Sequence, residues 1–484
     1  MTRDKMIRYK PGFYSFFDFL LGKGMKAIQL SGFSGALLLL AASAGAAEAP
    51  TVEAVLDNGM KVVIRPDDRA PVAVSQVWYR VGGIDEIGTL TGISHALEHI
   101  MFKGTRSVGP GEFARRVAAR GGQDNAFTNR DYTAYYQQIG SAALPEMFRL
   151  EADRMANLVI DADTLKNELE VIREERRMRT DDSPAAVLME KVRATAFKGP
   201  ARQPVIGWAD DIPRIDRGVL NDWYQRFYAP NNATLVVVGG VDPAQVLAAA
   251  RDTFGKLPRR DVRRPEAPVE PPMQDGPHRF VVEQPSQLPY LVMAWRVPKL
   301  NKLDDADPYA LSMLAATLDG IDASRLPKRV VREARIADSI NVDYNPASRG
   351  DTLFTITAVP AAGKTVAEVE KAIRTELTRL ARDGVSQDEL KRIRRQMMAS
   401  RIYQRDSQFA QAMNIGVLET RGFGWKAEDE MDARLNKVTS ADIQRVARAW
   451  LRDSALTVGV LKPLPPDPKH PLPAQNLKGD GNVH

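Results

Sequence analysis

Apolar and polar positions alternate along several short segments near the start of the chain. Residues 61–64 and 72–79 are rich in Val, Ile and aromatic side chains with partial period-two alternation, and a Pro-Asp-Asp turn lies between them. This pattern predicts two adjacent antiparallel strands. A later apolar run at 235–238 predicts a further strand, and the alanine-rich segment 243–251 after it predicts a helix.

Helical periodicity fills most of the sequence between these strands. The predicted helices lie at 111–119, at 142–158 and from 163 onward into a glutamate-rich segment. Residues 258–277 then break the pattern, because they contain six prolines and show no amphipathic period. We interpret them as a linker.

The order of elements begins again after this linker. The second set contains predicted strands at 279–284, 289–297 and 353–358 and a predicted helix at 306–318. We infer a diverged internal duplication, with an N-terminal domain over 47–257 and a homologous C-terminal domain over 278–463. Mixed strands and helices in both copies place the chain in the α+β class.

Composition agrees with two globular domains and narrows the chemistry. The chain has 484 residues, of which 44% are hydrophobic, and a net charge of +6 with acids and bases interspersed. That mild charge gives no support to a nucleic-acid partner. Cysteine is absent, which excludes disulfides, thiolate metal sites and cysteine nucleophiles.

The N-terminal region has the pattern of a secretory signal. Met25-Lys26 precedes an apolar run over 36–42 and a small-residue stretch over 43–47, so cleavage after Ala46 or Ala47 is expected. Residues 1–46 are therefore assigned to a signal region, with Met25 as the expected start, and export to a bacterial periplasm is expected. An uncleaved membrane anchor is the alternative. The proline-rich tail 464–484 is predicted to be disordered.

Two of the five histidines, His95 and His99, lie four residues apart with Glu98 between them. In a helix of 3.6 residues per turn, this spacing places both imidazoles on one face, close enough to bind one metal ion. Glu98 lies on the neighbouring part of that face, where a carboxylate could take a proton from an activated water. The pattern indicates a zinc peptidase site, with helix packing or capping as the alternative.

A catalytic zinc site needs a third protein ligand, and residues 167–177 offer candidates. Glu168 and Glu175 lie nearly two helical turns apart, so their carboxylates share a face, one as a possible ligand and one behind it. Glu170 and Glu174 point elsewhere. The arginines of the same segment would equally suit a solvated charged helix, and spacing alone leaves both interpretations open.

The inverted order His-x-x-Glu-His, followed by a glutamate-rich helix, resembles the pitrilysin and insulinase family of zinc metallopeptidases, the inverzincins, including exported bacterial members and mitochondrial processing peptidase subunits. Further matching segments lie at 56–60, 92–94, 101–105, 121–128, 131–135, 227–233 and 235–239. The resemblance implies one zinc ion per chain, with His95, His99 and Glu175 as ligands. It also implies that Glu168 is an auxiliary carboxylate and that Glu98 is the general base.

The resemblance further implies two homologous halves, each a mixed, mainly antiparallel sheet covered by helices, that face one another like a clamshell. In such enzymes an extended peptide adds as a strand to a sheet edge beside the metal. Asn125, Ala126 and Phe127 match that edge. The alternative is an ordinary strand entered through the Gly121-Gly122 turn.

The second half of such enzymes usually supplies an arginine and, seven residues later, a tyrosine, which hold the substrate and the developing oxyanion. Arg332 matches the arginine, but the tyrosine position falls on Ser339. Two explanations stay open. Either another side chain such as Tyr344 replaces the tyrosine, or a related chain completes the site in a heterodimer.

The leading hypothesis is an exported zinc endopeptidase that hydrolyses short unfolded peptides. The alternatives are a non-catalytic peptide-binding or assembly subunit and the catalytic chain of an obligate heterodimer; a homodimer is equally compatible with the sequence. A purely structural zinc ion is disfavoured because structural sites generally close the fourth position with a protein ligand.

Overall fold

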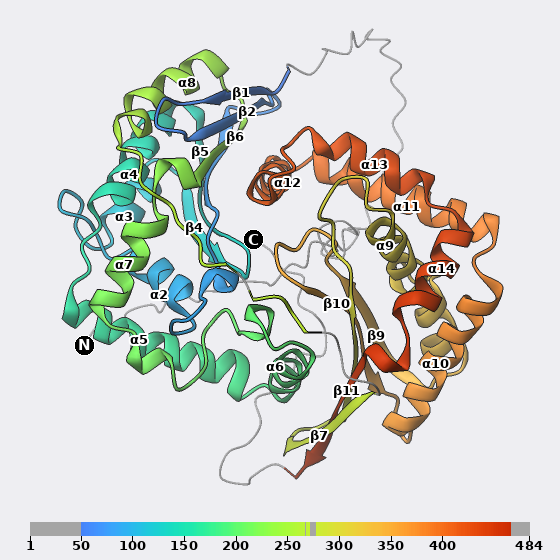
Figure 1. The fold of residues 1–484 in the computed structure, drawn as a ribbon. Coiled ribbons are helices and arrows are strands. Elements are labelled where there is room, and N and C mark those ends of the chain that lie inside the picture. The colour runs from blue at the N-terminus through green and yellow to red at the C-terminus, as the bar shows by residue number, and fades with distance from the viewer. Residues whose placement is uncertain (1–49, 267, 272–276, 466–484) are drawn as a thin grey trace, which may run out of the picture.

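A computed structural model describes residues 50–266, 268–271 and 277–465. The expected signal region and most of the expected tail lie outside these residues. The chain forms two halves, each a sheet with helices packed on it, that face one another (Figure 1). The described part of the chain contains no helix that is both long enough and apolar enough to cross a membrane.

The N-terminal half contains a six-stranded sheet in the order β1-β2-β6-β3-β5-β4. Its strands are β1 (Val52–Val55), β2 (Lys61–Pro66), β3 (Val72–Tyr79), β4 (Gln123–Thr128), β5 (Thr133–Gly140) and β6 (Ala233–Gly239). Strands β2 and β6 are parallel, and the other neighbours are antiparallel. Strand β4 therefore forms one edge of the sheet.

The prediction that β2 and β3 are adjacent is wrong, because β6 lies between them. Strand β6 contains the apolar run Leu235 to Val238, which is fully buried, so a central place in the sheet suits it. The short connection from β2 to β3 is long enough to pass one strand, since neighbouring strands lie only about 5 Å apart.

The C-terminal half repeats this arrangement with five strands in the order β7-β11-β8-β10-β9. They are β7 (His278–Pro285), β8 (Tyr290–Val297), β9 (Ala337–Tyr344), β10 (Thr352–Pro360) and β11 (Leu456–Leu464). The parallel pair, β7 and β11, occupies the same place as β2 and β6 in the first half. The shared order confirms the α+β fold of two related halves, and the described residues between 258 and 277 contain no helix or strand.

Helices cover both sheets. In the N-terminal half they are α2 (Ile93–Ile100), α3 (Glu112–Ala119), α4 (Leu144–Asn157), α5 (Ala162–Arg176), α6 (Pro184–Ala196), α7 (Arg217–Phe227) and α8 (Pro243–Asp252). In the C-terminal half they are α9 (Ala306–Asp319), α10 (Val366–Asp383), α11 (Gln387–Arg405), α12 (Gln408–Arg421), α13 (Ala427–Lys437) and α14 (Ser440–Trp450). Most predicted helices agree with these bounds to within a few residues.

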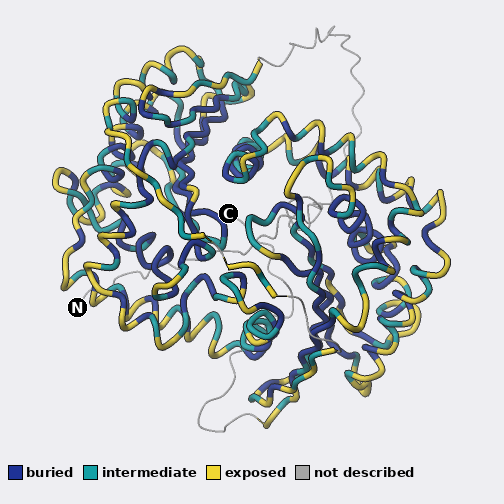
Figure 2. Tube along the Cα trace, viewed as in Figure 1, coloured by how far each residue is buried: buried dark blue, intermediate teal, exposed yellow. Residues whose placement is uncertain are grey.

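Two helices cross from one half to the other. Helix α6 packs on β8 and β11 of the C-terminal sheet, whereas α12 packs on β3 and β6 of the N-terminal sheet. The second contact is tight, because a Cβ atom on Gly416 of α12 would lie 1.9 Å from the indole of Trp78. Figure 2 shows buried residues along both sheets and on the helices that face them. The two halves thus share their packing.

Ion pairs add to this interface. The Asp131 carboxylate accepts from Arg421 at 2.8 Å, and Asp85 accepts from both terminal nitrogens of Arg349, at 2.8 and 2.9 Å. Both aspartates belong to the N-terminal half and both arginines to the C-terminal half. All four side chains are largely buried, so breaking one partner leaves a charge unpaired in a poorly solvated place.

Candidate metal centre

The helix that carries the histidine motif begins at a left-handed glycine. Gly92 has φ +85°, and a Cβ atom there would lie 2.7 Å from the carbonyl oxygen of Ile206, so only glycine fits. The buried Glu86 carboxylate accepts from the backbone N–H groups of Gly92 and Ser94 at 2.8 and 2.7 Å. Burial raises the pKa of Glu86, and these amide donors oppose that rise. Sequence reasoning missed this capping carboxylate.

Three predicted ligands meet where α2 lies against α5. The Nε2 atoms of His95 and His99 lie 3.6 and 3.3 Å from Oε2 of Glu175. One ligand atom from each of the three residues lies within 4.8 Å of the others, and no other such group of histidine and carboxylate side chains occurs in the described residues. Two imidazoles and one carboxylate match the donor set of a catalytic zinc site with one open position.

A second ring of contacts holds these side chains in place. His99 Nδ1 donates to Oε2 of Glu168 at 3.3 Å, and Lys103 donates to the other Glu168 oxygen at 2.7 Å. Arg179 occupies Oε1 of Glu175 at 2.6 Å, which leaves Oε2 facing the histidines. The structure therefore places Glu168 behind His99, as an auxiliary carboxylate would stand.

Arg179 comes from a π-helical segment, η3 (Arg177–Asp181), that continues α5. Its spacing of four residues from Glu175 is the signal that could have identified it, because such pairs are neighbours on a helix. Lys103 lies three residues after the end of α2 and had no comparable signal. Sequence reasoning named Arg179 only as one of several arginines that could pair with the glutamates, and Lys103 only as part of the matching segment 101–105, so it gave neither residue a role at the site.

The charges of the three ligand side chains are strongly coupled. Burial and the neighbouring His99 lower the pKa of His95 to about 3. Burial would also lower the pKa of His99, but its hydrogen bonds to Glu168 and Glu175 raise it to about 9. Burial would raise the pKa of Glu175, but His99, His95 and Arg179 lower it to about 2. A cation at this position replaces the proton of His99 and interacts with the ionised Glu175.

Glu98 lies on the same buried helix, α2, between the two histidines. Burial raises the pKa of Glu98, and a hydrogen bond with Thr128 opposes this. Oε2 of Glu98 is buried without a hydrogen-bond partner in the described part of the chain. An unpaired buried carboxylate oxygen is costly, so a group that donates a hydrogen bond to it is expected here. The residues present fit a metal ion with an activated water.

The predicted substrate edge coincides with β4, the edge strand of the N-terminal sheet, which contacts α2. Asn125, Ala126 and Phe127 all lie within it. Phe127 packs edge-on against Trp78 with ring centroids 5.5 Å apart. The N–H of Ala126 donates to Oδ1 of Asn125 at 2.8 Å, so an added strand would have to displace this side chain before using that donor.

The structure does not bring the predicted residues of the C-terminal half to the ligands. Arg332 is exposed on η8 (Pro327–Glu333) and donates to the carbonyl oxygen of Asp322 in its own half. Ser339 is exposed on β9. The Tyr344 ring is buried and its hydroxyl donates to the carbonyl of Pro298 at 2.6 Å, which disfavours it as a replacement for the family tyrosine. The role of Arg332 stays a prediction.

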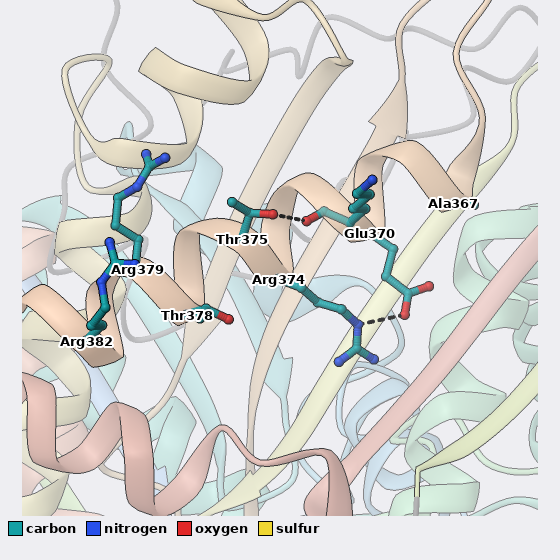
Figure 3. Close-up of a pocket in the computed structure, with 8 residues that line it drawn as sticks. Ala367, Glu370, Arg374, Thr375, Thr378, Arg379 and Arg382 are labelled. Atoms are coloured by element: carbon teal, nitrogen blue, oxygen red, sulfur yellow. Dashed lines mark hydrogen bonds and ion pairs between the residues drawn. The ribbon is translucent and has the colours of Figure 1, made fainter.

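A shallow hollow on α10 lies in the other half of the molecule from α2 and α5 (Figures 1 and 3). It is lined by Ala367, Glu370, Lys371, Arg374, Thr375, Thr378, Arg379 and Arg382. Figure 3 shows Arg374 directed at Glu370, which also accepts from Arg279 at 2.7 Å. Its one carboxylate is thus already paired, and we assign no ligand to it.

Comparison with known proteins agrees with this geometry. Residues 61–207 match the family model described as insulinase, peptidase family M16, and residues 214–397 match the model described as the peptidase M16 inactive domain. The zinc protease PqqE of Helicobacter pylori is 28% identical over 90% of this chain and 98% of its own length. An uncharacterised zinc protease of Streptomyces coelicolor is 28% identical over 84% of this chain and 89% of its own length.

Solved structures give the same result. The crystal structure of a protease from Helicobacter pylori superposes with a TM-score of 0.81 at 28% identity and covers 86% of this chain and 100% of the solved one. Two adjacent family models, relatives named zinc proteases and a shared two-sheet fold lead to one conclusion. The chain belongs to the insulinase family of zinc peptidases, peptidase family M16.

Proposed function

We propose that this chain is a zinc endopeptidase that hydrolyses short, unfolded peptides with Glu98 as general base. The observation that carries the proposal is the convergence of His95 Nε2, His99 Nε2 and Glu175 Oε2 between α2 and α5. The relatives named zinc proteases support the same class of reaction.

Each residue has a role that its position supports. His95, His99 and Glu175 would hold the metal, while Glu168 fixes the ring of His99 through Nδ1. A Zn²⁺ ion held there supplies a Lewis acid that polarises a peptide carbonyl and lowers the pKa of water. Glu98, with one carboxylate oxygen unpaired, accepts the proton of the attacking water and passes it to the leaving amine.

The substrate class follows from the edge strand. An added strand must be extended and free of its own tertiary structure, so β4 favours an unfolded peptide segment. The closely packed halves leave α12 beside the N-terminal sheet, which favours short chains over folded proteins. Residues Asn125 to Phe127 would pair with the peptide backbone and would therefore read main chain more than side chains.

Turnover of an unstructured quenched-fluorescence peptide tests the proposal. We expect the purified chain to cleave it, and we expect Glu98→Gln to keep zinc while losing at least about a hundredfold in rate, since a positioned base contributes about 10²–10⁴. Zinc measured in both proteins separates loss of the base from loss of the metal. Cleavage by Glu98→Gln at the normal rate would exclude the assigned role.

A catalytic chain that needs a related partner is the second candidate. It is favoured by Ser339 at the family tyrosine position, by the exposed Arg332 and by the buried hydroxyl of Tyr344. Zinc-loaded protein that binds peptides without cleaving them, but cleaves them once a related chain is added, would support this candidate. Binding that never leads to turnover would instead support a non-catalytic subunit.

We also propose that the chain is exported to a bacterial periplasm. The proposal rests on the signal-like pattern at residues 25–47, which lies outside the described residues. N-terminal sequencing of the exported protein tests it. A new N-terminus after Ala46 or Ala47 is expected, and an intact Met1 would contradict cleavage.

A further inference from the structure

Charged side chains gather where the turn between β4 and β5 meets the C-terminal half. These side chains interact electrostatically with one another, and the cations among them outnumber the carboxylates. The cations are Arg80, Arg130, Arg193, Arg264, Lys299, Arg349 and Arg421, and the carboxylates are Asp85, Asp131, Asp343 and Asp351. An excess of positive charge in a poorly solvated place is unfavourable unless an anion joins it.

The two buried carboxylates nearest to this turn, Asp131 and Asp85, already form ion pairs with other arginines. Asp131 accepts from Arg421 at 2.8 Å and from the backbone N–H of Arg349 at 3.2 Å. Asp85 accepts from the guanidinium of Arg349. Within the described residues, no carboxylate lies within 4.0 Å of a guanidinium nitrogen of Arg130 or Arg193.

The backbone around Arg130 is firmly held. Its carbonyl oxygen accepts from the N–H of Ile84 at 2.8 Å, and the side chain of Asn129 accepts from the N–H groups of Asp131 and Tyr132 at 2.7 and 3.0 Å. Nε of Arg130 is buried and has no hydrogen-bond partner in the part of the chain described. The turn thus presents a guanidinium whose donors are unused.

Arg193 of α6 reaches the same place. Its Nε donates to the carbonyl of Ala201 at 2.7 Å, in η4 (Pro200–Arg202), and its guanidinium lies 5.2 Å from the ring centre of Phe197. The segment η4 contacts η1 (Gly83–Asp85), the segment that holds the Arg130 turn. These contacts fix the stem of Arg193 and leave its two terminal nitrogens free to donate.

The two guanidinium groups also repel one another. Burial lowers the pKa of Arg193 well below its usual range, and the nearby Arg130 lowers it further. Burial lowers the pKa of Arg130 to about 10. The guanidinium group of arginine keeps its proton in proteins, so a shared anion would relieve a repulsion that the described side chains leave uncompensated.

This cluster lies close to the proposed catalytic centre. Arg130 follows Thr128, the last residue of β4 and the hydrogen-bond partner of Glu98, by two positions. Two extended residues span about 7 Å, so a peptide added along β4 would carry residues near its cleavage point to the turn that holds Arg130. Arg193 is near enough to Arg130 for their charges to interact. A carboxylate is the anion that a peptide brings.

We propose that Arg130 and Arg193 form a subsite that binds a carboxylate of the peptide substrate within a few residues of the cleaved bond. The inference rests on the proposed peptidase function and adds a substrate class to it. Two planar guanidinium groups bind a carboxylate with charge-assisted, bidentate hydrogen bonds. The carboxylate is either an Asp or Glu side chain or a free C-terminus, and the test separates these two sources.

Binding to the full-length, zinc-loaded Glu98→Gln protein provides the test without turnover. Four fluorescent peptides of one sequence carry Glu or Gln at one position and a free or amidated C-terminus. By fluorescence anisotropy, we expect at least one anionic form to bind about tenfold more tightly than the neutral amide, as a charge-assisted bond predicts. The peptide that binds more tightly shows whether the subsite binds a Glu side chain or a free C-terminus.

The same measurement on a variant that combines Arg130→Gln and Arg193→Gln should abolish the preference. A control that combines Arg382→Gln and Arg395→Gln removes the same charge from exposed helix surfaces and should keep the preference. Equal binding of all four peptides, or a preference that survives in the subsite variant, would overturn the proposal.

The two proposals fail separately. Wild-type cleavage of the peptides without any preference for a carboxylate would leave the peptidase function standing and remove the subsite. A preference that disappears with the two arginines, in a wild-type protein that cleaves none of the four peptides, would keep the subsite and remove self-sufficient catalysis.

Discussion

The two halves have the same five-strand order, yet they place different helices at the same position. In the first half, α2 is short and carries His95, Glu98 and His99, and it faces α5 and the edge strand β4. In the second half, α9 is longer, apolar and enclosed by α11, α13 and α14. The comparison teaches that the duplicated fold fixes where a helix lies, while its side chains and the elements that cover it decide whether it performs chemistry.

The two helices that cross between the halves, α6 and α12, differ from α2 and α9 in this respect, because they pack in a similar way in both halves. Helix α6 covers the C-terminal sheet, where Leu188 and Val192 pack beside Gly459 of β11. Helix α12 covers the N-terminal sheet, where Gly416 packs on Trp78. Each half thus contributes one helix to the sheet of the other half. The mutual packing is thus present in both halves, whereas the metal ligands lie in one.

The largest expected effect comes from removing a ligand. We expect one zinc ion per wild-type chain, and His99→Ala should lose both the zinc and all measurable turnover, because two remaining ligands hold the metal weakly. Elemental analysis of dialysed protein, together with the peptide assay, measures both quantities. Two zinc ions per chain, or zinc retained in His99→Ala, would break the comparison, since the second half would then hold metal as well.

The next effect concerns the crossing helices. Gly416→Ala should lower the free energy of unfolding by about 1–3 kcal/mol, because its Cβ would overlap the indole of Trp78 inside a packed interface. Chemical denaturation monitored by tryptophan fluorescence measures this change. Gly218→Ala in the exposed first turn of α7 is a matched control and should be neutral or slightly stabilising. Equal stability of Gly416→Ala and wild type would show that α12 does not pack firmly on this sheet.

A smaller effect is expected behind the histidines. Glu168→Gln should weaken zinc binding about 10–100-fold while turnover at saturating zinc falls less, because the change acts through His99. Competition with a chromogenic chelator measures the affinity. Glu170→Gln, which removes an exposed carboxylate paired with Arg173 on the same helix, should leave the affinity unchanged. The interpretation of Glu168 would be wrong if both variants behaved alike.

The smallest effect is a pH dependence of the zinc-free protein. The pKa of His95 is lowered to about 3, so only the unfolded chain gains a proton below pH 6.5 and stability falls toward acid. The pKa of His99 is raised to about 9, so the stabilisation by its protonated form is complete below pH 6.5 and is lost as the pH rises to about 9. The joint contribution of these two histidines to stability should therefore be greatest near pH 6.5.

Unfolding by denaturant in the presence of a chelator, from pH 5 to pH 9, measures this dependence. We expect His99→Gln to lose about 1–3 kcal/mol of the alkaline decrease, while the decrease caused by the raised pKa of buried Glu86 stays in both proteins. Zinc should remove the part that His99 contributes, because the metal takes the place of the proton. A zinc-free protein with equal stability at pH 6.5 and pH 9 would contradict the coupling of His99 to its two carboxylates.

The sequence could predict what depends on local pattern. The period of the apolar residues identified most strands and helices, and the spacing of His95, Glu98 and His99 identified the metal-binding face. It could not predict that β6 separates β2 from β3, because strand neighbours are chosen by pairing between segments far apart in the chain. The same limit hid the destination of α12, whose apolar residues show that it packs but not on what.

The roles of side chains that act through a neighbour could not be predicted either. Glu86, Lys103 and Arg179 hold the ligands or their helix, yet each is an ordinary charged residue in the sequence, and Arg179 was only one of several arginines near the glutamates. Arg130 and Arg193 are 63 residues apart in the sequence. Their charges interact only after α6 and the β4–β5 turn have folded together. Tertiary structure alone shows which charges are paired and which are left over.

The exchange of α6 and α12 has a consequence for how the chain acquires its structure. The last strand of the N-terminal sheet ends at Gly239, but the helix that covers one face of that sheet begins only at Gln408. During synthesis, the N-terminal half therefore cannot bury that face until most of the C-terminal half has been made. Such long-range contacts slow folding and leave apolar surface open to aggregation. We therefore expect the two halves to fold as one cooperative unit.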